Sequence, residues 1–126
     1  MNSFRLAVES GKLENIASCL AEDVVFKSPI VFKPYQGRVA VTALLRAVLV
    51  VLQDFRYHAT FENEHGAALE FSAKVGGREV QGIDLLELDA QGLVKKLTVF
   101  VRPLTAAHAL ASAMQAELGQ VAGATS

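Results

Sequence analysis

The sequence predicts a single α+β domain, because helical periodicity in its first half gives way to strand periodicity in its second. Apolar residues recur three to four positions apart up to about residue 53, and from residue 56 they alternate with polar ones. The chain has 126 residues, of which 52% are hydrophobic and 20% charged, so it can bury a core of its own. We expect residues 1–120 to form the domain and residues 121–126 to be a frayed tail.

Three helices are expected in the first half of the chain. The first covers residues 3–10 and stops at Gly11, since glycine favours the backbone conformation that ends a helix. The third follows Gly37, contains the most apolar stretch of the chain and ends near Gln53. The second is predicted by the helical spacing of Leu13, Ile16, Ala17 and Leu20.

Strands are expected at residues 24–26, before the third helix, and then at residues 56–62, 69–75, 78–88 and 93–102. The pair Gly76-Gly77 is a strong signal for a two-residue hairpin loop, and residues 89–92 form a second turn. Pro103 ends the sheet, and the spacing of apolar residues over 104–118 predicts a last helix. The expected order is therefore helices, a meander of strands and a C-terminal helix.

Asp84 is the most informative residue, because the turns place its side chain on an apolar face. If the glycine pair is the hairpin loop, Asp84 lies opposite Leu69. A four-residue second turn pairs Leu88 with Leu93 and sets Asp84 opposite Leu97. Both turns predict that this carboxylate points into the interior. A one-residue change in the second turn would instead place it beside Lys96 and Thr98.

Burial of a carboxylate has a cost that its surroundings must offset. Desolvation disfavours the charged form and raises the pKa of an aspartic acid. Acids perturbed in this way concentrate at functional sites, although structural hydrogen-bond networks also contain them. The structural alternative for Asp84 is a partner such as a backbone amide, Ser28, Thr42 or a buried water.

The expected outer face of the sheet is more apolar than a face that meets solvent should be. By the same alternation, Phe61 is expected on the inner face with Tyr57. The outer face is expected to carry Ile83, Leu85, Val94, Thr98 and Phe100. An apolar patch there indicates a symmetric homodimer, and cover by the C-terminal helix is the alternative.

Composition excludes several classes of partner. The net charge is −1, from 12 basic and 13 acidic residues without a basic cluster, so neither nucleic acid nor a membrane is an expected partner. Cys19 is the only cysteine and the first residues resemble no signal peptide, which predicts a cytoplasmic protein. The three histidines form no metal-spaced pair, and no cofactor motif is present, so we expect no metal and no cofactor.

Three segments carry a resemblance to a known family. They are Ala-Glu-Asp-Val-Val-Phe-Lys-Ser-Pro at residues 21–29, Tyr-Gln-Gly-Arg at 35–38, and Gly-Ile-Asp-Leu-Leu-Glu-Leu-Asp-Ala-Gln-Gly-Leu-Val at 82–94. With the order of elements, they resemble the nuclear-transport-factor-2-like superfamily, and within it the SnoaL-like polyketide cyclases and the ketosteroid isomerases. The resemblance covers nearly the whole chain. It identifies a fold better than an activity.

The resemblance implies a cone-like, cystatin-like roll, in which a curved mixed or antiparallel sheet wraps the N-terminal helices around a pocket. It assigns Asp84 as the pocket acid, which in the isomerases stays protonated and in the cyclases acts as general acid and base. Ser28 stands where the isomerases have their base, and Phe4 where they have a tyrosine. Ketosteroid isomerisation is therefore not expected, whereas a reaction that relies on a single acid is compatible with the sequence.

The candidate site consists of Asp84 as catalytic residue and a set of expected ligand contacts. The aromatic members of that set have ordinary core packing as their alternative role. The expected ligand-binding residues are Phe26, Ser28, Phe32, Tyr35, Leu69, Phe71, Leu97 and Val99.

Two functions fit these residues. The first is an isomerase, cyclase or lyase that acts on a small apolar or carbonyl-bearing molecule, with Asp84 as proton donor or shuttle. The second is a non-catalytic ligand-binding or dimerisation module of the same fold, in which Asp84 orients a ligand or joins the core. An Asp84 satisfied entirely by protein groups favours the module, and a free carboxylate oxygen in a cavity favours the enzyme.

Overall fold

The computed structural model describes residues 2–125 as one curved sheet with helices on its concave side. The six strands lie in the order β2-β1-β6-β5-β4-β3, and the sheet is mixed because β1 and β6 are parallel. This confirms the predicted α+β class and its cystatin-like arrangement. The elements are α1 (Ser3–Ser10), α2 (Leu13–Cys19), β1 (Leu20–Lys27), β2 (Tyr35–Gln36), α3 (Arg38–Val51), β3 (Gln53–Asn63), β4 (Gly66–Val75), β5 (Arg78–Leu88), β6 (Val94–Arg102) and α4 (Leu104–Thr125).

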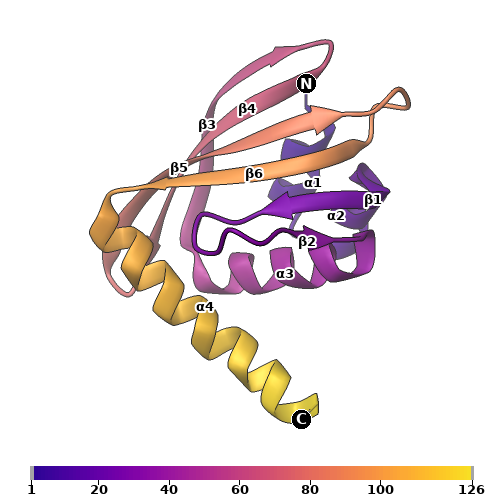
Figure 1. The fold of residues 1–126 in the computed structure, drawn as a ribbon. Helices are drawn as coiled ribbons and strands as arrows, with labels where there is room; N and C mark the ends of the chain where they lie inside the picture. The colour runs from indigo at the N-terminus through magenta and orange to yellow at the C-terminus, as the bar shows by residue number, and fades with distance from the viewer. Residues whose placement is uncertain (1, 126) are drawn as a thin grey trace.

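The N-terminal helices begin and end where local chemistry dictates. Asn2 caps α1, because its side-chain oxygen accepts a 3.0 Å hydrogen bond from the Arg5 amide. The second helix is one residue shorter than its apolar spacing indicated, since Leu20 already belongs to β1. The short strand β2 was not predicted, because two residues carry no periodicity. Figure 1 shows the sheet arching over α1, α2 and α3.

The first hairpin confirms the register on which the position of Asp84 depends. Gly76 and Gly77 have φ angles of 55° and 79°, the left-handed conformation that a tight hairpin loop requires. Val75 pairs with Arg78, and Leu69 therefore lies opposite Asp84, as predicted.

The predicted pairing after the second turn is wrong by one residue at Leu88 and by two residues at Asp84. Leu88 pairs with Val94, and Asp84 lies opposite Val99 instead of Leu97. The physical reason is the Asp89 carboxylate, which accepts hydrogen bonds from two loop amides and widens the turn, while a β-bulge shifts the register between Glu87 and Leu88. A shift of two keeps Asp84 on the inner face. The bulge turns Val94 inward to 1% exposure, so Val94 is not on the outer face as expected.

A second bulge, in β3, moves Phe61 to the outer face. The pairing of Tyr57 with Phe71 and of Thr60 with Leu69 leaves one extra residue in β3. Phe61 consequently lies beside Ala68 with 69% of its surface exposed, and its expected inner position is wrong.

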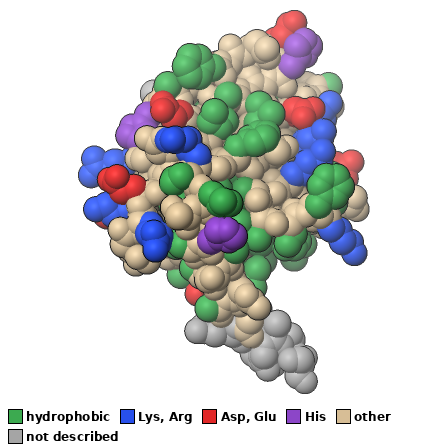
Figure 2. All heavy atoms as spheres, turned by 60° about the vertical axis from the view of Figure 1, so that its left-hand side comes forward, with side chains coloured by type: hydrophobic (Ala, Val, Ile, Leu, Met, Phe, Trp, Pro, Cys, Tyr) green, Lys and Arg blue, Asp and Glu red, His purple; other side chains and the backbone are tan. Residues whose placement is uncertain are grey.

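Helix α4 packs on the concave side of the fold and leaves the outer face open. It contacts α3, and its residues Ala106 and Leu110 are buried. Ile83, Leu85 and Phe100 stay 38–53% exposed, which contradicts cover of the outer face by the C-terminal helix. Figure 2 shows hydrophobic side chains exposed among charged ones on one side of the molecule.

The chain ends in the last turns of α4. The helix runs to Thr125, and Ser126 lies outside the described residues, so the frayed tail at 121–126 stays a prediction. Among the helices described, none combines the length and the apolarity needed to cross a bilayer.

Candidate functional site

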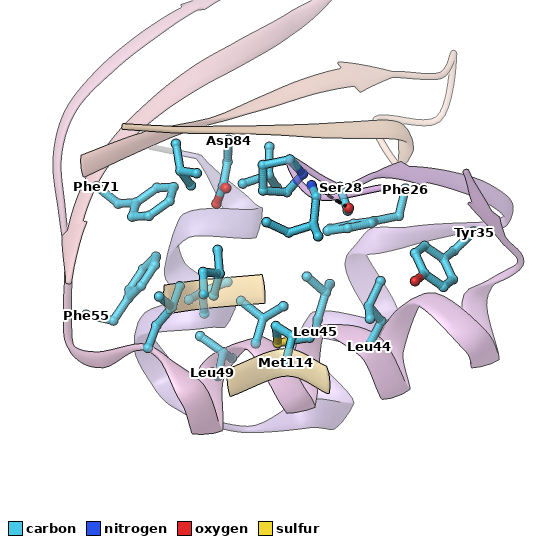
Figure 3. Close-up of a pocket in the computed structure, with 18 of the residues that line it drawn as sticks. Phe26, Ser28, Tyr35, Leu44, Leu45, Leu49, Phe55, Phe71, Asp84 and Met114 are labelled. Carbon is cyan, nitrogen blue, oxygen red and sulfur yellow. Dashed lines mark hydrogen bonds between the residues drawn. The ribbon is translucent and has the colours of Figure 1, made fainter. Parts of the chain in front are cut away.

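A cavity of about 320 Å³ lies between the concave face of the sheet and helices α1, α3 and α4. Its size falls at the lower end of the range of small-molecule sites. Most of its lining is aliphatic or aromatic (Figure 3). The polar side chains in the lining are Ser28, Tyr35, Tyr57, Asp84 and Gln115.

Asp84 reaches this cavity from the middle of β5 and has a strongly perturbed acidity. Its side chain points into the cavity in Figure 3, although the residue is only 8% exposed. The Tyr57 hydroxyl donates a 2.6 Å hydrogen bond to its Oδ2. Burial raises the pKa of Asp84 from 3.8 to about 6, and the Tyr57 hydrogen bond opposes part of that rise.

Tyr57 is held as a hydrogen-bond donor. Burial, followed by the charge of Asp84 and the hydrogen bond to it, raises the pKa of this phenol far above its usual value. The ring packs edge-on against Phe55 at 4.9 Å, and the Arg5 guanidinium lies 5.7 Å from the ring centroid. Arg5 also donates to the main-chain oxygens of Tyr57 and His58 at the β3 bulge, which ties α1 to this edge strand.

The second oxygen of Asp84 has no partner among the described residues. The Tyr57 bond is the single side-chain hydrogen bond of Asp84 within residues 2–119, so Oδ1 is free to meet a ligand. Neither of the two side chains considered from the sequence as its partner, Ser28 and Thr42, bonds to it. The Ser28 Oγ accepts from the amides of Ile30 and Val31, and the Thr42 Oγ1 is buried without a partner in the part of the chain described.

The expected ligand contacts separate into two groups. Five of the eight lie in the cavity lining, namely Phe26, Ser28, Tyr35, Phe71 and Val99. Leu69 and Leu97 are fully buried in the core and do not line the cavity. For Leu97 the reason is the corrected register, which pairs it with Leu86, one inward-facing position along β5 from Asp84.

Phe32 is also outside the cavity, and it is fully exposed at 101%. The Ser28 Oγ turns the loop after β1 by accepting two backbone N–H bonds. This turn brings Ile30 and Val31, rather than Phe32, into the lining of the cavity.

Sequence reasoning missed the partner of Asp84. Tyr57, Phe71 and Gly82 form one inward-facing row across β3, β4 and β5, next to the row of Asp84. The alternation of β3 already placed Tyr57 on the inner face, but a buried tyrosine is usually core. Sequence reasoning also missed the lining residues on α3 and α4, which include Leu44, Leu45, Leu49 and Met114. The reason is that tertiary packing decides where apolar helix faces leave a cavity.

The described residues offer no evident site for a metal ion. Among them no group of three or more histidine, cysteine, aspartate or glutamate side chains is placed to hold one. The Nε2 of His58 lies 2.6 Å from the Ser72 Oγ, but this pair is exposed and away from the cavity.

The chain is similar to a known protein family and to several solved structures. The family model of the SnoaL-like domain matches residues 2–97. This chain belongs to the SnoaL-like domain family. The resemblance recognised in the sequence is thereby confirmed, and the family's nuclear-transport-factor-2-like fold includes isomerases and cyclases. No curated protein sequence matches the chain significantly.

Solved structures similar to this SnoaL-like domain carry different descriptions. A steroid delta-isomerase from Pseudomonas aeruginosa is 36% identical, with a TM-score of 0.87 over 94% of this chain and 92% of that one. An uncharacterized bacterial protein with a cystatin-like fold from Silicibacter pomeroyi is 37% identical, with a TM-score of 0.86 over 90% and 81%. A SnoaL-like polyketide cyclase from Shewanella denitrificans, at 13% identity, TM-score 0.67 and coverage of 87% and 93%, shares the fold alone.

Proposed function

We propose that this SnoaL-like domain is an enzyme that moves a proton on a small, largely apolar, carbonyl-bearing molecule. The observation that carries the proposal is the free Oδ1 of Asp84 inside an apolar cavity. Reactions of this class are isomerisations, ring closures and eliminations next to a carbonyl group. Each needs one group that accepts a proton from carbon and then donates it to another carbon, to an oxygen or to the leaving group.

The acidity of Asp84 suits such a shuttle. With a pKa of about 6, most Asp84 side chains are ionised at pH 7 and a minor fraction is protonated. Oδ1 accepts the proton, while Oδ2 remains bound to the Tyr57 hydroxyl. Tyr57 does not itself lose its proton, because the pKa of its phenol is raised. We therefore assign Tyr57 as a positioning residue that fixes the orientation of the acid.

Ser28 is the candidate partner for the carbonyl oxygen of the substrate. Its Oγ accepts two backbone N–H bonds, and its hydroxyl hydrogen has no acceptor among the described residues. A hydroxyl donor stabilises the negative charge that develops on a carbonyl oxygen when a neighbouring carbon loses a proton. Ser28 cannot replace a carboxylate base, and Phe4, also in the cavity lining, cannot donate a hydrogen bond. The acid–base step therefore depends on Asp84 alone.

Proton exchange in heavy water tests the proposal without knowledge of the substrate. A set of ketones, from cyclohexanone and decalone to a steroid ketone, is incubated with the protein and followed by NMR; the steroid is included because the Pseudomonas relative is named a steroid delta-isomerase. We expect faster deuterium uptake beside the carbonyl of at least one ketone. Asp84→Asn should lower that rate by roughly 10²–10⁴-fold while the protein stays folded.

The competing function is a non-catalytic binding or dimerisation module. The Tyr57–Asp84 bond favours it, since this pair also joins β3 to β5 within the core. If the ketones bind without any gain in exchange, and Asp84→Asn changes only their affinity, the module is the better description. An Asp84→Asn variant that exchanges as fast as the wild type would exclude the catalytic role.

A further inference from the structure

Tyr35 brings a second phenol to the cavity, from the opposite edge of the sheet to Tyr57. It lies in β2, where it pairs with Phe26 of β1. The Gly37 amide extends this pairing with a 2.8 Å hydrogen bond to the main-chain oxygen of Val24. The Tyr35 ring also packs edge-on against Phe26, with 6.3 Å between the ring centroids. These contacts hold the ring on the concave side of the sheet.

The Tyr35 hydroxyl is free to meet a ligand. Of the two tyrosine hydroxyls in the described residues, that of Tyr57 is hydrogen-bonded and that of Tyr35 is not. The Thr42 Oγ1 is the one enclosed side-chain oxygen without a partner in the part of the chain described, so the Tyr35 oxygen is not sealed inside protein. Figure 3 shows this oxygen on the side of the ring that is turned away from β2, towards Leu44 of α3. A hydrogen-bonding group without a partner therefore meets the cavity here.

Tyr35 and Asp84 approach the cavity from strands that are not neighbours. In the order β2-β1-β6-β5, three strand spacings separate them. Neighbouring strands are about 4.8 Å apart, so the two backbones lie roughly 14 Å from each other along the sheet. The row of Tyr35 runs through Phe26 and Leu97 to Leu86. Leu86 is the next inward-facing position along β5 from Asp84, so a ligand that spans this part of the cavity meets a polar group at each end.

A free hydroxyl in an apolar wall selects among ligands. When a ligand enters the cavity, the Tyr35 hydroxyl loses the water to which it could otherwise bind. A ligand with an oxygen at this point replaces the lost hydrogen bond, whereas a purely apolar ligand leaves the hydroxyl unsatisfied. Sites that offer such a hydrogen bond discriminate against analogues that lack the matching group. The cavity should therefore prefer a ligand that carries an oxygen away from the reacting carbonyl.

Gln115 is the other polar side chain of the lining that has no role at the reacting carbonyl. It lies on α4 and is exposed, so bulk water competes for its amide. Tyr35 is half-buried, and its ring is held by Phe26. A ring that is already held loses less conformational entropy on binding than a free glutamine side chain does. Tyr35 is therefore the better anchor for a ligand oxygen.

We infer that Tyr35 binds a second oxygen function of the substrate, a carbonyl or a hydroxyl group, at the end of the cavity away from Asp84. The inference rests on the proposed function, because there Asp84 and Ser28 hold the reacting carbonyl group. The Tyr35 hydroxyl donates to a carbonyl oxygen or accepts from a hydroxyl group. The substrate class narrows from any small ketone to a compact apolar body with an oxygen function at both ends.

Pairs of ketones that differ in one oxygen test this contact. Each pair consists of a saturated cyclic ketone and the diketone of the same skeleton with its carbonyl groups at opposite ends, and skeletons of one, two and three fused rings vary the spacing. Dissociation constants are measured by NMR titration for the wild type, Tyr35→Phe and Tyr57→Phe. Tyr35→Phe keeps the ring that packs against Phe26 and removes the oxygen alone. Tyr57→Phe is the matched control, since it removes the same atom at the Asp84 end, where both members of a pair place a carbonyl group.

We expect the wild type to bind at least one diketone roughly three- to tenfold more tightly than the ketone of the same skeleton, the effect of one hydrogen bond. Tyr35→Phe should abolish this preference. Tyr57→Phe should preserve it, because any change in affinity at the Asp84 end falls on both members of a pair.

The outcomes distinguish this inference from the proposed function. If no diketone binds more tightly than its ketone, or if Tyr35→Phe keeps the preference, Tyr35 binds no second oxygen, while deuterium exchange that depends on Asp84 still supports the enzyme. If the preference depends on Tyr35 but the protein accelerates exchange in no ketone, the contact stands and the proposed enzyme is wrong. Loss of the preference in Tyr57→Phe as well would show a general effect on the cavity and overturn the inference.

Discussion

The Tyr57 hydroxyl and the Asp84 carboxylate form a 2.6 Å hydrogen bond across β4, from β3 to β5, inside a mostly apolar cavity. The bond supports the ionised form of Asp84, whereas burial of the same side chain disfavours it. Burial is the stronger of the two, so the pKa lies at about 6 rather than near 3.8. An acid balanced near neutral pH is the property that the proposed proton transfer requires.

Replacement of Asp84 by asparagine should stabilise the protein at high pH and not at low pH. The unfolded chain releases this proton near pH 3.8 and the folded chain near pH 6, so the folded state binds more protons between these values. The stability contributed by Asp84 is therefore fully present below pH 3.8 and is lost as the pH rises through 6. Unfolding of both proteins by urea at pH 4.5 and pH 8 should show Asp84→Asn gaining about 2 kcal/mol on the wild type over this interval.

An exposed aspartate provides the control for that comparison. Asp23→Asn on β1 removes the same charge from a solvated position. If the difference between the wild type and Asp84→Asn were the same at both pH values, or followed that of Asp23→Asn, the perturbed acidity of Asp84 would be refuted.

Removal of the Tyr57 hydroxyl should move the titration of Asp84 upward. The hydrogen bond lowers the pKa of the acid, so Tyr57→Phe leaves burial unopposed and raises that pKa above 6. NMR of the Asp84 side-chain carboxyl carbon against pH measures the shift directly. The pH dependence of deuterium exchange should move in the same direction, and stability should fall by about 1 kcal/mol. An unchanged titration would mean that the hydroxyl does not act on Asp84.

The inner face of the hairpin was predictable because its turn is encoded locally. Gly76 and Gly77 tolerate the left-handed backbone of a two-residue loop, and this alone sets Leu69 opposite Asp84. The second turn was not predictable in the same way. Its register depends on which amides the Asp89 side chain binds, and its bulge depends on the neighbouring strand.

The partner of Asp84 depends on a contact between strands that are not adjacent in the sheet. Tyr57 and Asp84 are separated by β4, and the hydroxyl reaches across because the sheet is curved and β3 carries a bulge after Tyr57. No short-range pattern encodes that curvature. The cavity itself is the space that several apolar faces leave unfilled, so its lining follows from packing and not from periodicity.

Gly82 should tolerate no side chain. It faces Phe71 across the β4–β5 pair, and a Cβ at this position would overlap the Phe71 ring and the Phe100 carbonyl oxygen. Gly82→Ala should cost roughly 1–3 kcal/mol, because overpacking forces the ring away. Phe71 stacks on Phe55 at 5.0 Å in the cavity wall, so binding of the ketones used in the exchange test should weaken too.

Gly119 offers the matched substitution, since a Cβ there meets nothing within 4 Å. Gly119→Ala in α4 should raise stability by roughly 0.5–1 kcal/mol, the usual gain for alanine over glycine inside a helix. Chemical denaturation of both variants checks the pair. A neutral effect of Gly82→Ala would show that the Phe71 ring can move without cost.

The outer face of the sheet should hold two copies of the chain together. Ile83 and Phe100 lie opposite each other on β5 and β6, with Leu85 next along β5, and all three are exposed. The bulge in β3 adds Phe61, which pairs with Ala68 beside Leu85, so the patch extends across four strands. A patch of this kind on an antiparallel face is typical of a self-complementary interface.

Light scattering coupled to gel filtration should therefore give a mass of twice the 13.5 kDa of one chain at micromolar concentration. Phe100→Glu should convert this species to a monomer, because the interface would bury the introduced carboxylate without a counter-charge. Val39→Glu is the matched control, since Val39 is 87% exposed on α3, away from the sheet. A wild-type monomer, or dissociation by Val39→Glu as well as by Phe100→Glu, would place the outer face outside any interface of this domain.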